Sequence, residues 1–396
     1  MGSNRLSVGL GFGMATKERK MGMIAQIKSH LPEMLGMLKT MVEYETPSGD
    51  TEACDALVEW LSGVVAERGG SAEIVQGEGN SNQLRATWGS GEEQILILCH
   101  LDTVWDKGEV ARRPFRVLGD LAFGPGIYDM KAGVVISLFA LSHLAGQGWP
   151  LKKRVVALFT TDEEVGSSNS RPIIEKEALL STTVLVLEPA MASGALKTAR
   201  KGVGDFHIRV EGIASHSGSA PEKGASAILE LAKQTIALHA MTDMALGTTI
   251  NVGVVAGGTR ANVVAALAEA HVDLRVTSMA EAERIVPQIL VRVADTPGTR
   301  VTVTGGLNRP PMERSVATAA LFAEAQSVAA LLGFHLEEGS AGGGSDGNFT
   351  AALGLPTLDG LGAVGDGAHA LDEHVSIPHL AERTALLIGL LERIGQ

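Results

Sequence analysis

Apolar residues recur along the first quarter of the chain at the spacing of amphipathic helices and then at the spacing of strands. From Ile24 to Val42, and again from Thr51 to Arg68, they return every three or four residues. This spacing predicts two helices, the second of which ends at Gly69-Gly70. Short strands are expected next, at Ser71–Val75 and Gln83–Trp88.

Three later runs are apolar at nearly every position. They are QILILC, RVVALFT and TVLVL, at Gln94–Cys99, Arg154–Thr160 and Thr183–Leu187. Continuous apolar runs are typical of strands covered on both faces in a parallel or mixed sheet. Helical stretches at Lys131–Ala145 and Pro172–Leu180 separate the runs. The alternation predicts a three-layer α/β domain with a mixed sheet.

From about Gly202 the order of the elements changes. The pattern predicts, in turn, a strand, a helix, two strands, a helix and a strand, at 205–210, 225–241, 248–255, 266–276, 280–293 and 299–304. This order predicts a ferredoxin-like α+β domain inserted into the first domain, and helices at 317–333 and 378–394 then complete the first domain. The expected organisation is a flexible N-terminal extension, a first domain in two parts and the insert, at 1–20, 21–201 with 311–396, and 202–310.

Composition and charge narrow the functional classes. The 396 residues are 45% apolar and 20% charged, which is typical of a folded globular protein, and the net charge is −12. So acidic a chain has no general attraction to nucleic acid or to anionic membranes, and we expect neither as a partner. No apolar run approaches the roughly 20 residues of a membrane-spanning helix.

The two cysteines and the N-terminal residues indicate the cellular compartment of the protein. Cys54 and Cys99 do not form a disulfide scaffold, and Cys99 is expected to be a buried thiol. The cytoplasm is therefore the expected compartment. Residues 1–20 weakly resemble a secretory signal, so a periplasmic or secreted location stays open as the alternative.

Potential metal ligands follow each of the three apolar strands. The first strand runs into His100-Leu101-Asp102, the second into Asp162-Glu163-Glu164, and the third into Glu188. The carboxyl ends of parallel strands form the edge at which open α/β sheets bind ligands. A further acid, Asp129, lies in the glycine-rich segment GPGIYDMKAG just before a predicted helix.

Each of these features taken alone has an ordinary explanation. A His-x-Asp pair can be a hydrogen-bonded surface pair, and strand-end acids can cap helices or be solvated in turns. Their co-occurrence favours another interpretation, because several neighbouring buried carboxylates need a cation to neutralise them. A mixed histidine and carboxylate set suits zinc, cobalt or manganese. One acid could then bind metal while its neighbour moves the proton of an attacking water.

Two late segments are rich in glycine. GDGAHALDEH contains His369 and His374, which as isolated loop histidines would be surface residues. GSAGGGSDG, at Gly339–Gly347, lacks the Gly-Lys-Ser/Thr ending of a phosphate-binding loop. We interpret it as a flexible loop beside the substrate.

Five ordered motifs together resemble the co-catalytic zinc aminoacylase and carboxypeptidase family, which includes glutamate carboxypeptidase, aminoacylase and succinyl-diaminopimelate desuccinylase. The motifs are HLDTVW, GPGIYDMKAG, TTDEEVGS, LEPA and GAHALDEH, and the resemblance runs from about residue 30 to the end. It extends to SHSGSAPEKG in the insert, and among these members it is nearest to glutamate carboxypeptidase. The resemblance implies a metal-dependent amide hydrolase whose insert is a lid and dimerisation domain.

The resemblance also implies roles for single residues. Two zinc ions, with cobalt or manganese as alternatives, would be bound by His100 and Glu188 at one site, by Glu164 and His369 at the other, and by Asp129 between them. Asp102 would orient His100, and Glu163 would be the general base. His216 would stabilise the oxyanion, often in the active site of the other subunit of a homodimer.

Two features predict the substrate class: one of the metal ligands, and the side chains that could bind a substrate carboxylate. By resemblance, Glu at position 188 favours carboxypeptidases and deacylases, and hence an N-acyl amino acid or C-terminal residue. Arg275, Arg309 and Asn262 are the candidates that would hold the substrate's free carboxylate.

Tyr128 and Met130 depart from the family pattern, and we expect them to make the pocket wall larger and more apolar. An arginine of the family has no in-register match, because Gly305-Gly306 occupies its place. An amidohydrolase for an aryl or xenobiotic amide is therefore the alternative, and a non-catalytic metal-binding dimer is a distant third.

Overall fold

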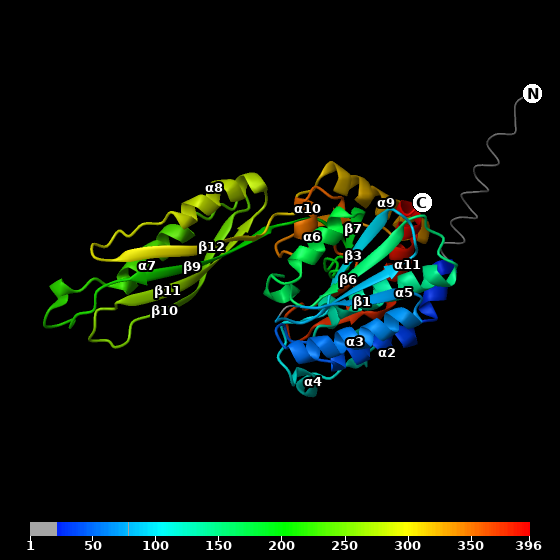
Figure 1. Ribbon diagram of the computed structural model, residues 1–396, viewed down its shortest axis with the longest axis horizontal. Coiled ribbons are helices and arrows are strands. Elements are labelled where there is room, and N and C mark those ends of the chain that lie inside the picture. The colour runs from blue at the N-terminus through cyan, green and yellow to red at the C-terminus, as the bar shows by residue number, and fades with distance from the viewer. Residues whose placement is uncertain (1–21, 78) are drawn as a thin grey trace, which may run out of the picture. The chain divides into compact units, whose positions relative to one another are not determined.

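The computed structural model describes residues 22–77 and 79–396, so the extension expected at 1–20 lies outside the described residues (Figure 1). The chain forms two compact units. Unit 1 comprises the chain up to Thr198 together with Arg314–Ser340 and Ser345–Gln396. Unit 2 comprises Ala199–Glu313 and Ala341–Gly344.

A six-stranded mixed sheet forms the centre of unit 1. Its order is β1-β2-β6-β3-β7-β14, with bounds Ser71–Val75, Gln83–Trp88, Arg154–Thr160, Gln94–His100, Ser181–Val186 and Thr357–Leu358. The strands from β6 to β14 are parallel, whereas β2 is antiparallel to both β6 and β1. The predicted mixed sheet is therefore confirmed.

Helices cover both faces of this sheet because β3 is apolar on both. Alternate residues of β3, Ile95 and Ile97, belong to a core shared with α2 (Leu31–Glu43), α3 (Thr51–Glu67), α5 (Ala132–Gly146), α9 (Val316–Leu332) and α11 (Ile377–Ile394). Leu96 and Leu98 point into a second core with α6 (Arg171–Leu179) and α10 (Gly347–Ala352). These two cores make the three layers that the sequence predicts.

The first predicted helix is interrupted. Residues 22–28 are helical, Ser29 and His30 form a turn, and α2 begins at Leu31 with Pro32 in its first turn. Proline has no backbone N–H and clashes with the preceding turn, so it begins a new helix here. The predicted continuous helix from Ile24 to Val42 is wrong at this point.

Unit 1 also contains small elements outside the central sheet. A second sheet has the order β15-β16-β5-β4, with bounds Gly365–Asp366, His374–Ser376, Leu121–Phe123 and Arg116–Leu118. Short helices are α4 (Glu109–Arg112), η1 (Ile127–Lys131) and η2 (Glu163–Val165). The strand β8 (Leu196–Arg200) pairs with β13 (Glu338–Ala341), and both strands begin in unit 1 and end in unit 2. The pattern of apolar residues does not predict the short helices α4, η1 and η2 or the strands β4, β5, β8 and β13.

Unit 2 has the β-α-β-β-α-β order that the sequence predicts. Its elements are β9 (Gly202–Glu211), α7 (Ala227–His239), β10 (Thr249–Gly257), β11 (Leu267–Val276), α8 (Met279–Leu290) and β12 (Arg300–Arg309). The antiparallel sheet has the order β10-β11-β9-β12, and both helices share a core with it. Ser226 and Ser278 cap the two helices by accepting a hydrogen bond from a first-turn N–H.

One helical stretch has the length and apolar composition of a membrane span. It is Ile127–Gly146, which joins η1 and α5, and 83% of its apolar window is buried inside the protein. In this fold it is the core helix between the sheet and α11.

Candidate metal centre and active site

The parallel strands of unit 1 bring the predicted ligands to one edge of the sheet. β3 ends at His100, η2 with Glu163 and Glu164 follows β6, and Glu188 follows β7 by two residues. The strands β6, β3 and β7 are adjacent and parallel, so these ends meet. Asp129 reaches the same edge from η1, at the start of the core helix.

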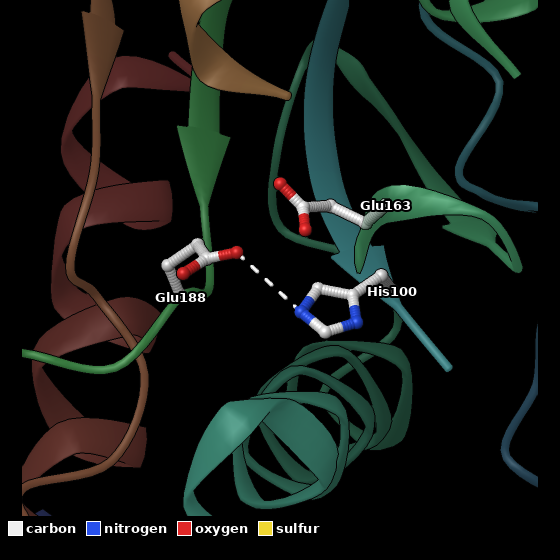
Figure 2. Close-up of side chains that lie close together, drawn as sticks. All are labelled: His100, Glu163 and Glu188. Atoms are coloured by element: carbon white, nitrogen blue, oxygen red, sulfur yellow. Dashed lines mark ion pairs between the residues drawn. The ribbon is translucent and has the colours of Figure 1, made fainter. Parts of the chain in front are cut away.

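His100, Glu163 and Glu188 surround one point (Figure 2). His100 Nε2 lies 3.5 Å from Glu188 Oε1, and one ligand atom from each of the three residues lies within 4.8 Å of the others. Figure 2 shows the carboxylates of Glu163 and Glu188 turned towards the space beside the imidazole. Both His100 and Glu188 are buried, at 1% and 6% exposure.

A second point lies on the other side of Asp129. Its Oδ1 is 3.1 Å from His100 Nε2, while its Oδ2 is 3.5 Å from His369 Nε2. His369 also lies 3.1 Å from Glu164 Oε2. One carboxylate therefore stands between two histidines, as in a ligand that bridges two cations. His369 holds this position with a φ of 61°, a left-handed conformation that is uncommon outside glycine.

The electrostatics of the cluster favour positive charge at both points. Burial lowers the pKa of His100, but hydrogen bonds to Asp102, Asp129 and Glu188 outweigh burial and raise that pKa well above 6.5. Hydrogen bonds to Asp129 and Glu164 raise the pKa of His369 to about 10. Burial raises the pKa of Asp129, but the two histidines hold it far below its usual range.

Asp102 organises more than the histidine. Its main-chain oxygen is 3.0 Å from His100 Nδ1, and its carboxylate is 3.5 Å away. The carboxylate also accepts the backbone N–H groups of Glu163 and Glu164, at 3.1 and 3.2 Å, and the hydroxyl of Ser48 at 2.6 Å. One buried carboxylate thus orients a ligand histidine and the turn that presents two acids.

Glu373 is a site residue that the sequence analysis missed. Its carboxylate is 2% exposed and accepts four hydrogen bonds, from the backbone N–H groups of Gly126, Tyr128 and Asp129 and from Trp105 Nε1. These bonds tie the turn that carries Asp129 to the segment that follows His369. The signal was visible in the quoted motif ALDEH, but nothing in the sequence says which backbone the acid would meet.

Tyr128 and Met130 do not form the apolar pocket wall that we expected. They are 6% and 1% exposed and belong to the core beneath the site. The Tyr128 hydroxyl donates to the Ala190 carbonyl at 2.6 Å, and Met130 Sδ lies 3.2 Å from the backbone nitrogen of His100. These side chains support the ligand turns from behind. His374 belongs to neither ligand group, and its ring lies against that of Phe123, with 5.2 Å between the ring centroids.

The loop Gly339–Gly347 is held by hydrogen bonds at Gly343, Gly344, Ser345 and Asp346. Gly343 and Gly344 accept hydrogen bonds from Arg200, and Ser345 donates to Asp359 at 2.6 Å. Asp346 accepts hydrogen bonds from the hydroxyls of Thr160 and Ser167. These contacts argue against the flexibility that we expected of this loop, whereas its place beside the substrate stays a prediction.

His216 lies on an exposed turn of unit 2 whose hydrogen bonds define its tautomer. Its Nδ1 accepts the backbone N–H groups of Gly218 and Ser219, both at 3.1 Å. A neutral imidazole that accepts at Nδ1 carries its proton on Nε2. The ring therefore offers one N–H donor to a group outside the turn.

Unit 2 does not bring the other three predicted residues together. Asn262 is beside His216, because its carbonyl accepts the N–H of Ser217 at 3.1 Å. Arg275 and Arg309 both align with Val203, at the start of β9, whereas the turn with His216 follows the end of that strand. At about 3.3 Å per residue the two ends are about 25 Å apart. Arg275 is also paired with Asp273 at 2.8 Å, and Arg309 is buried.

The donor set fits a pair of divalent cations. In unit 1, three carboxylates and two histidines surround two points that share Asp129, and Glu163 lies beside them. The five residues are His100, Asp129, Glu164, Glu188 and His369. Imidazole nitrogen and carboxylate oxygen are the ligands that zinc, cobalt and manganese accept. Within residues 22–77 and 79–396, every ligand group of this kind includes His100.

Comparison with known proteins agrees with this geometry. Residues 96–393 match the model of peptidase family M20/M25/M40. Carboxypeptidase G2 of Pseudomonas sp. (strain RS-16) is 30% identical over 384 residues, covering 92% of this chain and 90% of that protein. Acetylornithine deacetylase of Klebsiella pneumoniae (strain 342) is 28% identical over 271 residues, covering 63% and 69%. A tripeptidase from Staphylococcus aureus has the same fold, with a TM-score of 0.77 at 19% identity and coverage of 92% and 98%.

Proposed function

This chain belongs to peptidase family M20/M25/M40 and is a metal-dependent hydrolase, and we propose that it cleaves an amide bond whose amine side carries a free carboxylate. The observation on which the proposal rests is Asp129, whose two oxygens face two different histidines. The family resemblance seen in the sequence is confirmed by the match over most of the chain.

We propose that two metal ions, zinc in the first place, are bound at these points. His100 and Glu188 would bind one ion, Glu164 and His369 the other, and Asp129 both. When bound, such a pair supplies Lewis acidity that polarises the substrate carbonyl and makes water a better nucleophile at neutral pH. Asp102 and Glu373 would act on the ligands and not on the substrate.

Glu163 is the proposed general base. It is adjacent to the ligand Glu164, and its backbone is fixed by Asp102. Its carboxylate would take a proton from the attacking water and return it to the leaving amine. The Nε2–H of His216 would donate to the oxyanion that develops on the carbonyl oxygen.

The substrate class rests on the relatives and on the arginines of unit 2. One relative is named a carboxypeptidase and another a deacetylase, and both names imply an amide or peptide bond next to an amino acid. Arg309 and Arg275 lie at the same end of unit 2, where one or both would hold the substrate carboxylate. The existing pair of Arg275 with Asp273 keeps the aryl amide alternative open.

We also propose a homodimer formed through unit 2. The separation of His216 and Asn262 from the two arginines means that one ligand cannot touch both ends within one copy of unit 2. A second copy could supply the missing end. β10 is an edge strand with exposed Val254 and Val255, as expected of a strand that pairs with another chain.

The test is hydrolysis of a substrate panel by the zinc-loaded chain and by Glu163→Gln. The panel holds N-benzoyl-glutamate, a folate, N-acetyl amino acids, dipeptides and aryl amides, each with a chelator control. We expect cleavage of substrates with a free carboxylate, abolished by chelator and lowered about 10²–10⁴-fold by Glu163→Gln at unchanged metal content. Cleavage of aryl amides alone would favour the alternative, and near wild-type turnover by Glu163→Gln would remove its role as base.

A further inference from the structure

One face of the unit 2 sheet is not covered by the helices of that unit. Along β9 and β11, alternate residues belong to the core shared with α7 and α8, whereas the residues between them are half-buried or exposed. The strands β9 and β11 are the two central strands of this sheet (Figure 1). On their open face, His207 of β9 lies directly opposite His271 of β11.

The two imidazoles lie against each other and are accessible to solvent. Their ring centroids are 5.0 Å apart, and their planes are tilted by 40°. The side chain of His207 is 36% exposed, and His271 is exposed as well. Within residues 22–77 and 79–396 neither ring forms a hydrogen bond, and a carboxylate oxygen of Glu269 lies 3.9 Å from His207 Nε2. Each neutral imidazole therefore keeps an acceptor nitrogen for a ligand.

The spacing of these rings is that of two histidines on one metal ion. With metal–nitrogen bonds of about 2.0 Å and a tetrahedral angle between them, the centres of two bound imidazoles are about 5 Å apart. The observed 5.0 Å agrees with this separation. The register of the two antiparallel strands already holds the pair at this distance. Rotation of two exposed side chains is enough to direct both rings at one ion.

We propose that His207 and His271 bind a divalent transition-metal ion on this face, with Glu269 as the third ligand and water in the remaining positions. Ligand atoms of one tetrahedral ion lie about 3.3 Å apart, so a small rotation of Glu269 closes the gap to His207. Imidazole nitrogens with a carboxylate suit copper, nickel and zinc, and Cu²⁺ is expected to bind most tightly of the three.

The charges around the pair are compatible with a cation. Glu269 Oε1 now accepts from Arg209 at 2.7 Å, but Arg209 also lies 3.6 Å from Glu211. Arg209 therefore keeps an acidic partner when Glu269 turns towards the ion. Asp205, two residues from His207 on the same face, adds an exposed carboxylate that makes no ion pair within the described part of the chain.

This site is distinct from the metal centre of unit 1 and does not depend on the proposed function. None of its three residues belongs to the ligand groups around His100. A bound ion would connect the two central strands of the unit 2 sheet through side chains as well as backbone. Its occupation can therefore be measured without any assay of amide hydrolysis.

The experiment is a titration of the zinc-loaded full chain with Cu²⁺ and with Ni²⁺, followed by electron paramagnetic resonance for copper. Because copper can also displace zinc from the metal centre, the zinc content is measured at each point by elemental analysis. His207→Gln and His271→Gln each remove one imidazole, and Glu269→Gln removes the carboxylate. His335→Gln, at a histidine that is 77% exposed in unit 1, is the control.

We expect wild type to bind one Cu²⁺ per chain without loss of zinc, with nitrogen coupling in the spectrum and weaker binding of Ni²⁺. Copper affinity should fall about tenfold or more in His207→Gln and His271→Gln, and about threefold in Glu269→Gln. His335→Gln should titrate like wild type. The same copper affinity in wild type and both histidine variants of the pair, or copper uptake only as zinc is released, would overturn the proposal. An unchanged affinity in Glu269→Gln would remove that residue from the ligand set.

Discussion

The two units hold their candidate active-site residues in opposite ways. In unit 1 the ligands His100 and Glu188 are buried, and further side chains fix the backbone of the site, as Asp102 does for Glu163 and Glu373 does for Asp129. In unit 2, His216 and Asn262 are exposed on turns, and Arg275 is paired with a neighbour on its own strand. The ligands of unit 1 are therefore preorganised to bind metal, whereas His216 and Asn262 of unit 2 need contacts from outside their turn to be held in place.

This difference gives a rule for what each substitution should change. A change at the buried ligands or their supports should alter metal content or affinity, because the backbone there is held by the altered group. A change at His216 should alter turnover while leaving the metals in place. The predictions below test this division, beginning with the largest expected effect.

Asp129→Asn should weaken metal binding at both points. The substitution removes the charge of the one carboxylate that faces both His100 and His369, and the single oxygen of asparagine cannot serve both points. We expect activity to fall by more than about 10³-fold, with metal content well below two ions per chain by elemental analysis. Asp106→Asn, at an exposed position, is the control. Full metal content with normal turnover would contradict the bridging role.

His216→Ala should lower kcat by about 10²–10³-fold at unchanged metal content. The loss is expected because the Nε2–H is the donor that the turn leaves available. His335→Ala, at an exposed histidine of unit 1, is the control. A loss of metal from His216→Ala would contradict the proposal that unit 1 holds the metals without help from unit 2.

Mixing inactive chains sharpens this prediction. If His216 acts in the site of the partner subunit, dimers of a Glu163→Gln chain with a His216→Ala chain contain one intact site. An equal mixture after subunit exchange should regain roughly a quarter of wild-type activity. If His216 acts within its own chain, both sites of the mixed dimer are defective and no activity returns.

Glu373→Gln should weaken metal binding by about 10–100-fold without removing a ligand. The carboxylate accepts four hydrogen bonds with two oxygens, and the amide nitrogen of glutamine cannot accept any. Part of the support of the Asp129 turn is therefore lost. Competition with a chelator measures the affinity, and Asp372→Asn, an exposed neighbour, is the control. An unchanged metal affinity would show that Glu373 is only a structural residue.

The strand ends that carry the metal ligands could be predicted from sequence. The side chains that hold the ligand backbone in place, such as Glu373, could not. The runs that become β3, β6 and β7 are apolar throughout, so the edge holding His100, Glu164 and Glu188 was visible. Glu373 lies 244 to 247 residues from the N–H groups it accepts, and no local pattern reports such pairing. Whether Tyr128 lines a pocket or fills the core is also decided by tertiary packing.

Glu230→Gln tests whether unit 2 owes its local order to its own buried acid. Glu230 on α7 is fully buried and accepts the N–H groups of Asp295 and Thr296, at 3.1 and 2.7 Å, together with an amide N–H of Gln234. Burial raises the pKa of Glu230, but these hydrogen bonds outweigh burial and lower it to about 2. A depressed pKa stabilises the fold above the unfolded value near 4.5, and this stability is lost as the pH falls towards 2.

Substitution by glutamine should therefore cost about 1–3 kcal/mol at pH 7 and progressively less below pH 4.5. Hydrogen exchange of the peptide covering 293–299 measures the effect where the bonds lie, because local opening exposes those amides. Glu283→Gln, exposed on α8, should exchange like wild type. Metal content should be unaffected by either change, since unit 1 orders its ligands through its own contacts. An equal difference at pH 7 and pH 3 would mean that packing, and not the charge of Glu230, orders this part of unit 2.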